Sequence, residues 1–445
     1  MRIKKMKLRN KLSLVLLAAL LCSFFSLTVC AADHSELDVD IPSSRAKAVY
    51  LYSYEGDRVL MLNGENKKLP PVSTAKMMAG LLACEKYADR LDERVTVSSK
   101  MLEGVSGNAM GLRSGTEITV RELLYGVACG CNNDAAIVLA YACAGSVEAF
   151  VEEMNGYAKR LDMRSTRYTD TTGFETNAFT SITDVAKLAR AAVDNKLYLE
   201  ISSTQSYELV LNGTATTVYN RNALISQFST QGYLNKYASG LIAGSTEEAG
   251  YVLATFAQKN DKSFLCIVMG ASANSDEIYS YKIVNDLLNT AFSDYSVKKI
   301  ASADDIMTKA QVSLALTDKN GAFVSCRLAE DVSALLPYGV DVADVRAEVY
   351  LHDEEICAPV TKGEIVGGVD FYYNDVYLAS GRLIAGEDVE PSALLLMLNR
   401  LRSFFLSRAF IIAVAIAVPS IATYLFINRR HLRKKSEIVR FKRFY

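Results

Sequence analysis

The chain has 445 residues, which is too long for one average domain, so two folded units and additional targeting segments are expected. Its formal net charge of −1 excludes the basic composition typical of nucleic-acid-binding proteins. Two of the nine cysteines fall in the first 32 residues, which leaves seven, and an odd number at irregular spacing argues against a disulfide framework. Free buried thiols are therefore expected.

The N-terminus carries a targeting signal. A basic run, MRIKKMKLRNK, precedes the apolar stretch LSLVLLAALLCSFFSLTVCAA, which ends in small residues. This order is typical of a secretory signal peptide, here assigned to residues 1–32 with cleavage near Ala31 or Ala32. The alternative is a lipid anchor on Cys30, but Val29 stands where such a site prefers a small residue.

Residues 38–297 form the first predicted domain. The segment AKAVYLYSYEGDRVLML predicts two strands around a Glu-Gly-Asp turn. Pro70 and Pro71 then end any strand, and STAKMMAGLLACEKYA has apolar residues at helical spacing, so Ser73 is expected at the start of a helix.

The middle of this domain predicts helices, and its end predicts strands. A capping box from Thr119 to Glu122 opens the helix RELLYGVAC, and further helices are predicted for AAIVLAYAC, VEAFVEEMNGYAKRL and ITDVAKLARAAVDN. AGYVLATFAQ and SFLCIVMGA are predicted as neighbouring buried strands. This order indicates an α/β (α+β) domain in which helices pack on one sheet.

Residues 298–389 predict a small all-β domain. Asn320-Gly321 lies between two alternating runs, which is a strong hairpin signal, and RAEVYL, GEIVGGVDFYY and VYLASGRLIA continue the strand pattern. No cluster of catalytic residue types occurs in this segment, so a spacer or docking role is expected.

The C-terminal segments predict a membrane anchor. Apolar and Arg residues alternate at helical spacing over 390–408, which favours an amphipathic segment at the outer leaflet. Residues 409–427 are apolar and long enough to span a bilayer, and residues 428–445 form a basic tail. The positive-inside rule places that tail in the cytoplasm and the two domains outside the plasma membrane.

Histidine is absent from the first domain, because the three histidines of the chain are His34, His352 and His431. A Ser-His-Asp triad and a His-bound catalytic zinc are therefore excluded there, and no metal or cofactor is expected. A serine nucleophile would need another base. Lysine can serve if its pKa is lowered from about 10.4 toward neutrality, a shift of about 4 kcal/mol against the ammonium form.

A Ser-x-x-Lys pair supplies such a nucleophile and base at Ser73 and Lys76, three residues apart and so on one face of a helix. The same spacing occurs at two other places in the chain, so the pattern alone is weak. The context favours Ser73, which follows two prolines that end the preceding strand and precedes an apolar helix. The alternative is a solvated serine that caps the helix.

The segment LPPVSTAKMMAGLLACE resembles the nucleophile helix of the penicillin-binding D-Ala-D-Ala carboxypeptidases, the low-molecular-mass serine peptidases of peptidase family S11. GLRSGTEITVRELLYGVACGCNNDAA, FVEEMNGYAKRLDMRSTRY and AGSTEEAGYVLAT match the same family in order, and LAEDVSALLPYGVDVADVRAEV matches its C-terminal β domain. The resemblance implies a transpeptidase-like α/β domain, a following β domain, peptidoglycan stem peptides as substrate and β-lactams as acylating ligands.

The resemblance also assigns the site residues. Ser73 and Lys76 match the family's nucleophile and base, while the second motif, Ser-x-Asn, falls on Cys131 and Asn133, so a thiol replaces the expected hydroxyl. The third motif, Lys-Thr-Gly, which binds the substrate in this family, aligns with three consecutive residues of a strand, Ile242, Ala243 and Gly244.

Two functions therefore stay open. The first is a serine D-Ala-D-Ala carboxypeptidase with low or altered activity, and the second is an inactive pseudoenzyme that binds cell-wall peptides or partner proteins. Lys236 is six residues from Ile242, about 20 Å along a strand, and is too distant to replace the missing lysine. A β-lactamase is disfavoured by the β domain and the membrane anchor.

Overall fold

The computed structural model describes residues 34–37, 39–175, 177–228, 230–316, 322–352 and 355–441. The chain divides after Val297 into two compact units, which are described separately. The expected signal peptide at residues 1–32 lies outside the described residues.

A six-stranded sheet forms the centre of the first unit, in the order β1-β3-β2-β10-β9-β8. Every neighbouring pair in it is antiparallel. The hairpin predicted around the Glu-Gly-Asp turn is confirmed as β2 and β3, and the two late strands are confirmed as the paired β9 and β10. The strands are β1 (His34–Ser35), β2 (Ala48–Ser53), β3 (Arg58–Asn63), β8 (Ala238–Thr246), β9 (Gly250–Lys259) and β10 (Lys262–Ala271).

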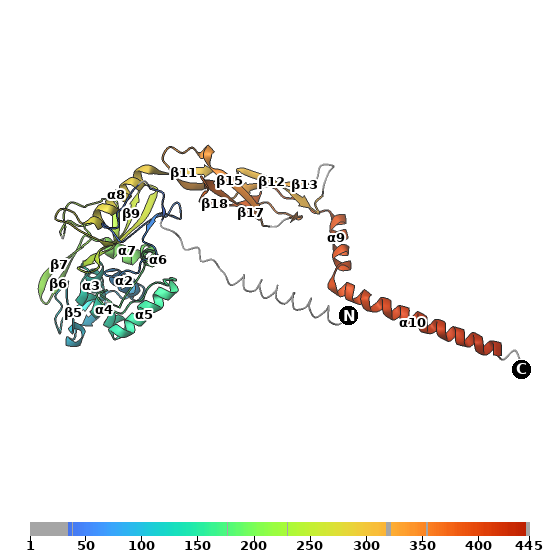
Figure 1. Ribbon diagram of the computed structural model, residues 1–445, viewed down its shortest axis with the longest axis horizontal. Coiled ribbons are helices and arrows are strands. Elements are labelled where there is room, and N and C mark those ends of the chain that lie inside the picture. Colours follow the sequence, from blue (N-terminus) through green and yellow to red (C-terminus); the bar gives the residue numbers. More distant parts are fainter. Residues whose placement is uncertain are drawn as a thin grey trace, which may run out of the picture. The chain divides into compact units, whose positions relative to one another are not determined.

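Helices cover both faces of this sheet, as Figure 1 shows with β9 between α8 and the lower helices. α8 packs on β9 and β10, whereas α6 packs on β2 and β10, and α2 and α7 pack on β8. A buried apolar helix, α2, thus lies against the edge strand that carries the third motif. The helices are α2 (Thr74–Tyr87), α3 (Val120–Ala128), α4 (Asn133–Ala144), α5 (Val147–Arg160), α6 (Ile182–Asp194), α7 (Lys196–Ser203) and α8 (Tyr279–Asp294).

The predicted capping box is confirmed at the start of α3. Thr119 Oγ1 accepts a hydrogen bond from the amide of Glu122 at 3.2 Å, and the Glu122 carboxylate accepts one from the amide of Thr119 at 2.8 Å. These two bonds satisfy amides that have no partner within the helix. They fix where α3 begins, and the helix ends at Ala128. Cys131 of the second motif therefore lies in the short connection to α4, and Asn133 is the first residue of α4.

Two small hairpins and one short 3₁₀ helix complete the described part of the first unit. β4 pairs with β5, and β6 pairs with β7, both antiparallel. The β6–β7 hairpin, α7 and α8 were not predicted from the sequence. These elements are η1 (Ser99–Leu102), β4 (Arg94–Thr96), β5 (Glu117–Thr119), β6 (Ser206–Leu211) and β7 (Thr214–Tyr219).

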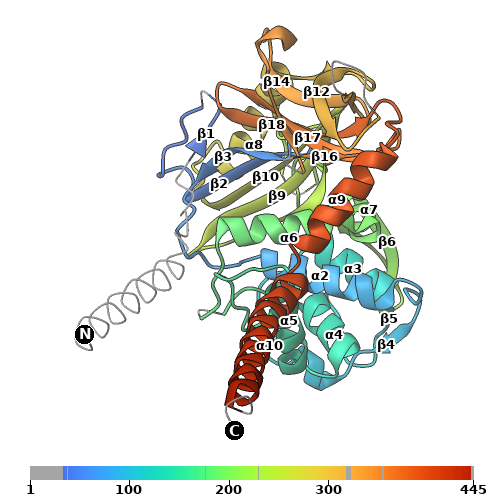
Figure 2. The same cartoon turned by 90° about the vertical axis from the view of Figure 1, so that its right-hand side faces the viewer.

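The second unit contains a six-stranded sheet in the order β15-β17-β18-β13-β12-β16 and a two-stranded sheet of β11 and β14. Figure 2 labels β12, β16, β17 and β18 of the larger sheet. β12 and β13 pair antiparallel, as predicted, although the Asn320-Gly321 turn lies outside the described residues. The elements are β11 (Tyr295–Ala301), β12 (Ile306–Ser313), β13 (Ala322–Leu328), β14 (Val332–Pro337), η2 (Val342–Asp344), β15 (Arg346–Leu351), β16 (Ile356–Cys357), β17 (Ile365–Tyr373) and β18 (Val376–Ala385).

Two helices follow the β domain. α9 (Ala393–Phe405) exposes several apolar side chains together with Arg400 and Arg402, and α10 (Arg408–Phe441) follows it. Within α10, Arg408–Arg430 contains an 18-residue window with a mean hydropathy of 2.4 and is long and apolar enough to cross a bilayer. The predicted span at 409–427 lies inside this stretch.

Candidate active site

Ser73 lies immediately before α2, where the chain turns sharply out of the Pro70-Pro71 segment. The preceding residue, Val72, has a φ of +48°, a left-handed conformation that a β-branched side chain rarely adopts. Ser73 is 3 % exposed and makes no capping hydrogen bond to the helix. The alternative of a solvated helix-capping serine is therefore wrong.

Two predicted site residues, Cys131 and Gly244, converge on Ser73. The Cys131 thiol donates a hydrogen bond to Ser73 Oγ, with Sγ and Oγ 3.1 Å apart. A Cβ atom placed on Gly244 would overlap Ser73 Oγ, and it would lie 3.0 Å from Ser73 Cβ and 3.4 Å from Cys131 Sγ. The first motif, the second motif and the glycine of the third motif thus meet at one point between α2 and β8.

Cys131 is presented by a strained backbone. Its φ is +52°, in the left-handed region, and it lies between the C-terminus of α3 and the first residue of α4. Asn108 holds this turn, since its side-chain amide donates to the carbonyl oxygens of Gly130 at 2.6 Å and Cys131 at 3.1 Å. The turn therefore has a fixed direction, which aims the thiol at Ser73.

Lys76 lies one turn along α2 and is 2 % exposed. Its Nζ donates a hydrogen bond of 2.7 Å to the carbonyl oxygen of Thr172. Burial lowers the pKa of Lys76, Arg221 lowers it further, and the nearby Cys131 and Asp170 oppose that change. The net direction favours the neutral amine, which is the form that can accept a proton.

The Thr172 carbonyl that binds Lys76 belongs to a loop that the Asp170 side chain stabilises. The Asp170 carboxylate accepts hydrogen bonds from the amides of Thr172 at 3.2 Å, Gly173 at 3.1 Å and Phe174 at 3.2 Å. Gly173 has a φ of +79°, and a Cβ on it would overlap the carbonyl oxygen of Val72. The loop thus packs tightly against the residue that precedes the nucleophile. Sequence reasoning did not identify Thr172 or Asp170.

Asn133, the retained residue of the second motif, is 3 % exposed. Its Nδ2 donates to the carbonyl oxygen of Ser106 at 2.6 Å, whereas its Oδ1 has no hydrogen-bond partner among the described residues. A buried amide oxygen without a partner is costly, and a ligand N–H could satisfy it.

The strand β8 brings the third motif to the site without its polar groups. Ile242 and Ala243 are 1 % and 4 % exposed, and Ile242 belongs to the same apolar cluster as Cys131. A bulge precedes them, and Asn222 Nδ2 and Thr255 Oγ1 both donate to the carbonyl oxygen of Gly240 at 2.9 Å. The backbone of the motif is therefore well placed, but no cation occupies its first position.

Arg221 is a cation near the site that sequence reasoning missed. Its guanidinium donates to Asn108 Oδ1 at 3.4 Å, and Asn108 in turn holds the Cys131 turn. The signal that could have revealed it is the polar run Asn-Arg-Asn at 220–222, directly after a strand-like stretch. In the described part of the chain, no group of three or more His, Cys, Asp or Glu side chains could hold a metal ion.

Comparison with known proteins relates both units to cell-wall peptidases. Residues 35–273 match the family model described as D-alanyl-D-alanine carboxypeptidase, and residues 295–391 match that of the penicillin-binding protein 5 C-terminal domain. The chain is 28 % identical to D-alanyl-D-alanine carboxypeptidase DacF of Bacillus subtilis over 397 residues, which cover 86 % of this chain and 97 % of DacF. It is 29 % identical to DacC of Escherichia coli over 379 residues, which cover 83 % and 90 % of the two chains.

Solved structures share the fold. Penicillin binding protein 5 from Haemophilus influenzae matches with a TM-score of 0.63 at 24 % identity, covering 79 % of this chain and 99 % of that one. The D-alanyl-D-alanine carboxypeptidase DacD from Francisella tularensis matches with a TM-score of 0.64 at 19 % identity, covering 82 % and 98 %. The predicted fold class, a penicillin-binding α/β domain followed by a β domain, is confirmed.

Proposed function

Because the chain belongs to the D-alanyl-D-alanine carboxypeptidase family, we propose that it cleaves the terminal D-alanine from peptidoglycan stem peptides through acylation of Ser73. The observation that carries this proposal is the convergence of Ser73 Oγ, Cys131 Sγ and the Cα of Gly244 beside a buried lysine whose pKa is lowered. A nucleophile, a proton carrier and a base whose pKa is lowered are thus within one site.

The proposed reaction has two steps. Ser73 Oγ attacks the carbonyl carbon of the scissile peptide bond, and its proton passes to Lys76, directly or through the Cys131 thiol. The carbon–nitrogen bond then breaks, and the D-alanine amine leaves with a proton from Lys76. Water next hydrolyses the Ser73 ester and releases the shortened peptide.

Substrate binding uses groups around this centre. Asn133 Oδ1 accepts a hydrogen bond from a substrate amide, and the backbone amides of Ser73 and of β8 after Gly244 stabilise the oxyanion. β8 is the last strand in the order of its sheet, so its free edge can pair with an extended peptide.

The replaced third motif favours low or altered activity. A hydrogen bond to a charged group contributes about 1.5–3 kcal/mol, so loss of the motif lysine weakens recognition of the substrate carboxylate about tenfold to a hundredfold. The same observation favours a second candidate function, a pseudoenzyme that binds cell-wall peptides or partner proteins without turnover. Ile242 and Ala243, packed where polar groups would bind the substrate, support that alternative.

The proposed location is the plasma membrane, with both domains on its outer side. The apolar stretch Arg408–Arg430 is followed by a strongly basic tail, and such an excess of Lys and Arg marks the cytoplasmic side. With this proposed topology, the site faces the cell wall, where the proposed substrate occurs.

Labelling with a fluorescent penicillin tests the proposal. Membranes that contain the full chain are treated with the reagent, and the labelled band is compared with that of Ser73→Ala. Covalent labelling that disappears in the variant supports an acylating serine enzyme. Absence of label at high reagent concentration, with an intact fold by circular dichroism, would favour the pseudoenzyme.

A further inference from the structure

A polar groove lies beside the nucleophile, on the side of the second motif. It has a volume of about 270 Å³, and residues 216–219 of β7 form part of its wall. Gly130 and Asn132 also line it. These two residues flank Cys131, whose thiol donates a hydrogen bond to Ser73 Oγ. The groove therefore borders the active site.

Arg221 is the one charged residue among the described residues that line this groove. It is exposed and makes no salt bridge with any carboxylate of the described residues, and its hydrogen bond to Asn108 Oδ1 is long, at 3.4 Å. Asp134, two residues after Asn132, is buried, and its carboxylate already accepts hydrogen bonds from three amides of the segment 110–112. A positive charge without an acidic partner favours an anionic ligand.

The backbone at Arg221 is held between the second and third motifs. The amide of Arg221 donates to the carbonyl oxygen of Cys129, directly after α3, at 3.0 Å. The next residue, Asn222, is buried, and its Nδ2 donates to the carbonyl oxygen of Gly240 at 2.9 Å. Gly240 lies in β8, two residues before Ile242. An exposed guanidinium thus projects from a fixed backbone that is bonded to the strand from which the motif lysine is missing.

We propose that Arg221 binds a carboxylate group of the peptide substrate and supplies the positive charge that the third motif lacks at Ile242. The identity of the ligand, a cell-wall peptide, rests on the proposed function. A guanidinium can bind both oxygens of a carboxylate through two parallel N–H groups, and such bonds are about twice as strong as those between neutral groups. The side chains of Ile242 and Ala243 offer the carboxylate no hydrogen bond.

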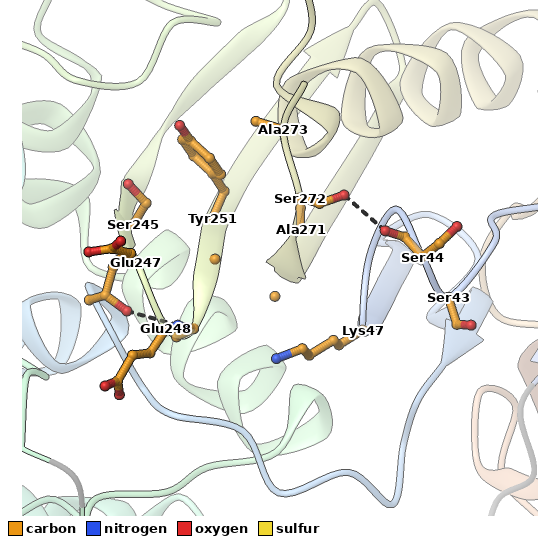
Figure 3. Close-up of a pocket in the computed structure, with 14 residues that line it drawn as sticks. Ser43, Ser44, Lys47, Ser245, Glu247, Glu248, Tyr251, Ala271, Ser272 and Ala273 are labelled. Carbon is orange, nitrogen blue, oxygen red and sulfur yellow. Dashed lines mark hydrogen bonds between the residues drawn. The ribbon is translucent and has the colours of Figure 1, made fainter. Parts of the chain in front are cut away.

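A pocket at the end of the central sheet is larger, at about 460 Å³, but is less suited to a carboxylate. Figure 3 shows it between the turn after β8 and the segment that leads into β2. Lys47 lines it together with Glu247 and Glu248, so its lining carries a net negative charge. That charge opposes an anion, whereas the lining of the groove at Arg221 contains no acidic residue.

Calorimetric titration of the full chain in detergent micelles tests this role. Ser73→Ala is the parent of the series, so that no probe is cleaved. N-acetyl-D-alanyl-D-alanine has a terminal carboxylate, its C-terminal amide has none, and N-acetyl-D-glutamyl-D-alanyl-D-alanine amide has a carboxylate in a side chain. We expect at least one of the two acids to bind about tenfold more tightly than the uncharged amide. The two acids distinguish a terminal carboxylate from an internal one.

Three variants in this background assign the preference to Arg221. Arg221→Gln should abolish the preference for the acid, because glutamine keeps a hydrogen-bond donor for Asn108 but carries no charge. Arg221→Lys should keep part of it, since the charge is retained without the two parallel N–H groups. Arg164→Gln is the matched control. It removes an exposed arginine that pairs with Asp162 and does not line the groove, so the preference should not change.

The comparison of acid with amide separates ligand binding from a structural role. The proposal is overturned if the acids and the amide bind equally to Ser73→Ala, or if none of them binds. It is also overturned if Arg221→Gln weakens all three probes by the same factor, as a distorted site would. A chain that is not labelled by penicillin but shows the expected preference would refute turnover and support this proposal, so the two failures are distinguishable.

Discussion

Gly244→Ala is the sharpest test of the active-site geometry. The added methyl group would overlap Ser73 Oγ and lie 3.0 Å from Ser73 Cβ, closer than ordinary carbon contacts. The hydroxyl must therefore turn away from Cys131, or α2 and β8 must separate. A displacement of about 1 Å at a reacting atom reduces the rate about a hundredfold. Overpacking of a buried contact also destabilises by about 1–3 kcal/mol.

Two measurements check this prediction on the same samples. The second-order rate of acylation by fluorescent penicillin should fall about a hundredfold. The Tm should fall by about 2–4 °C for each kcal/mol lost, and this readout remains valid if the parent chain is not acylated.

Gly156→Ala is the matched control, because this glycine lies within α5 and a Cβ on it would meet nothing within 4 Å. It should leave the rate unchanged and stabilise the chain by about 0.5–1 kcal/mol. If Gly244→Ala keeps both the parent rate and the parent Tm, the contact between α2 and β8 is not as described.

Three further changes probe the groups around the nucleophile. Cys131→Ser restores the hydroxyl typical of the family, so penicillin labelling should persist or increase. If a methylating thiol reagent reduces the labelling of the parent, it should not reduce the labelling of this variant. Labelling gels measure both effects. Combining Ile242→Lys with Ala243→Thr should increase the acylation rate about tenfold to a hundredfold by restoring charged contacts, as stopped-flow or gel kinetics would show, and no gain would mean that the cleft is altered beyond this motif. Arg221→Met removes a charge that lowers the pKa of Lys76, so that pKa should rise and the neutral amine should become scarcer at a given pH. The acylation rate, measured as a function of pH, should then increase at a higher pH than in the parent. An unchanged pH profile would contradict the influence of Arg221 on the pKa of Lys76.

The sequence was sufficient to predict the strands and helices with strong local patterns. The strand-like runs on either side of the Glu-Gly-Asp turn and the capping box at Thr119 are local signals, and both features appear where expected. The meeting of Ser73, Cys131 and Gly244 was expected from the family resemblance, not from spacing, because these residues come from different elements.

Contacts between distant segments could not be predicted in this way. Nothing near Thr172 indicates that its carbonyl binds Lys76, since a backbone group carries no sequence signal. Arg221 and Asn108 are 113 residues apart, and their pairing depends on how two loops fold over the site. The pocket at the end of the central sheet combines Lys47 with the turn after β8 for the same reason. The β6–β7 hairpin was missed because several of its side chains are exposed, which weakens the apolar alternation.

The hydrogen bond from Lys76 to Thr172 joins residues 96 positions apart, and that from Cys131 to Ser73 joins residues 58 positions apart. Neither bond can form unless the helices between its partners have packed, so the assembled nucleophile depends on long-range tertiary structure. A chain that has folded its N-terminal hairpin and α2 alone would hold Ser73 without its partners. Covalent labelling of Ser73, where it occurs, would therefore count the correctly folded molecules in a preparation, which a measurement of helix content cannot do.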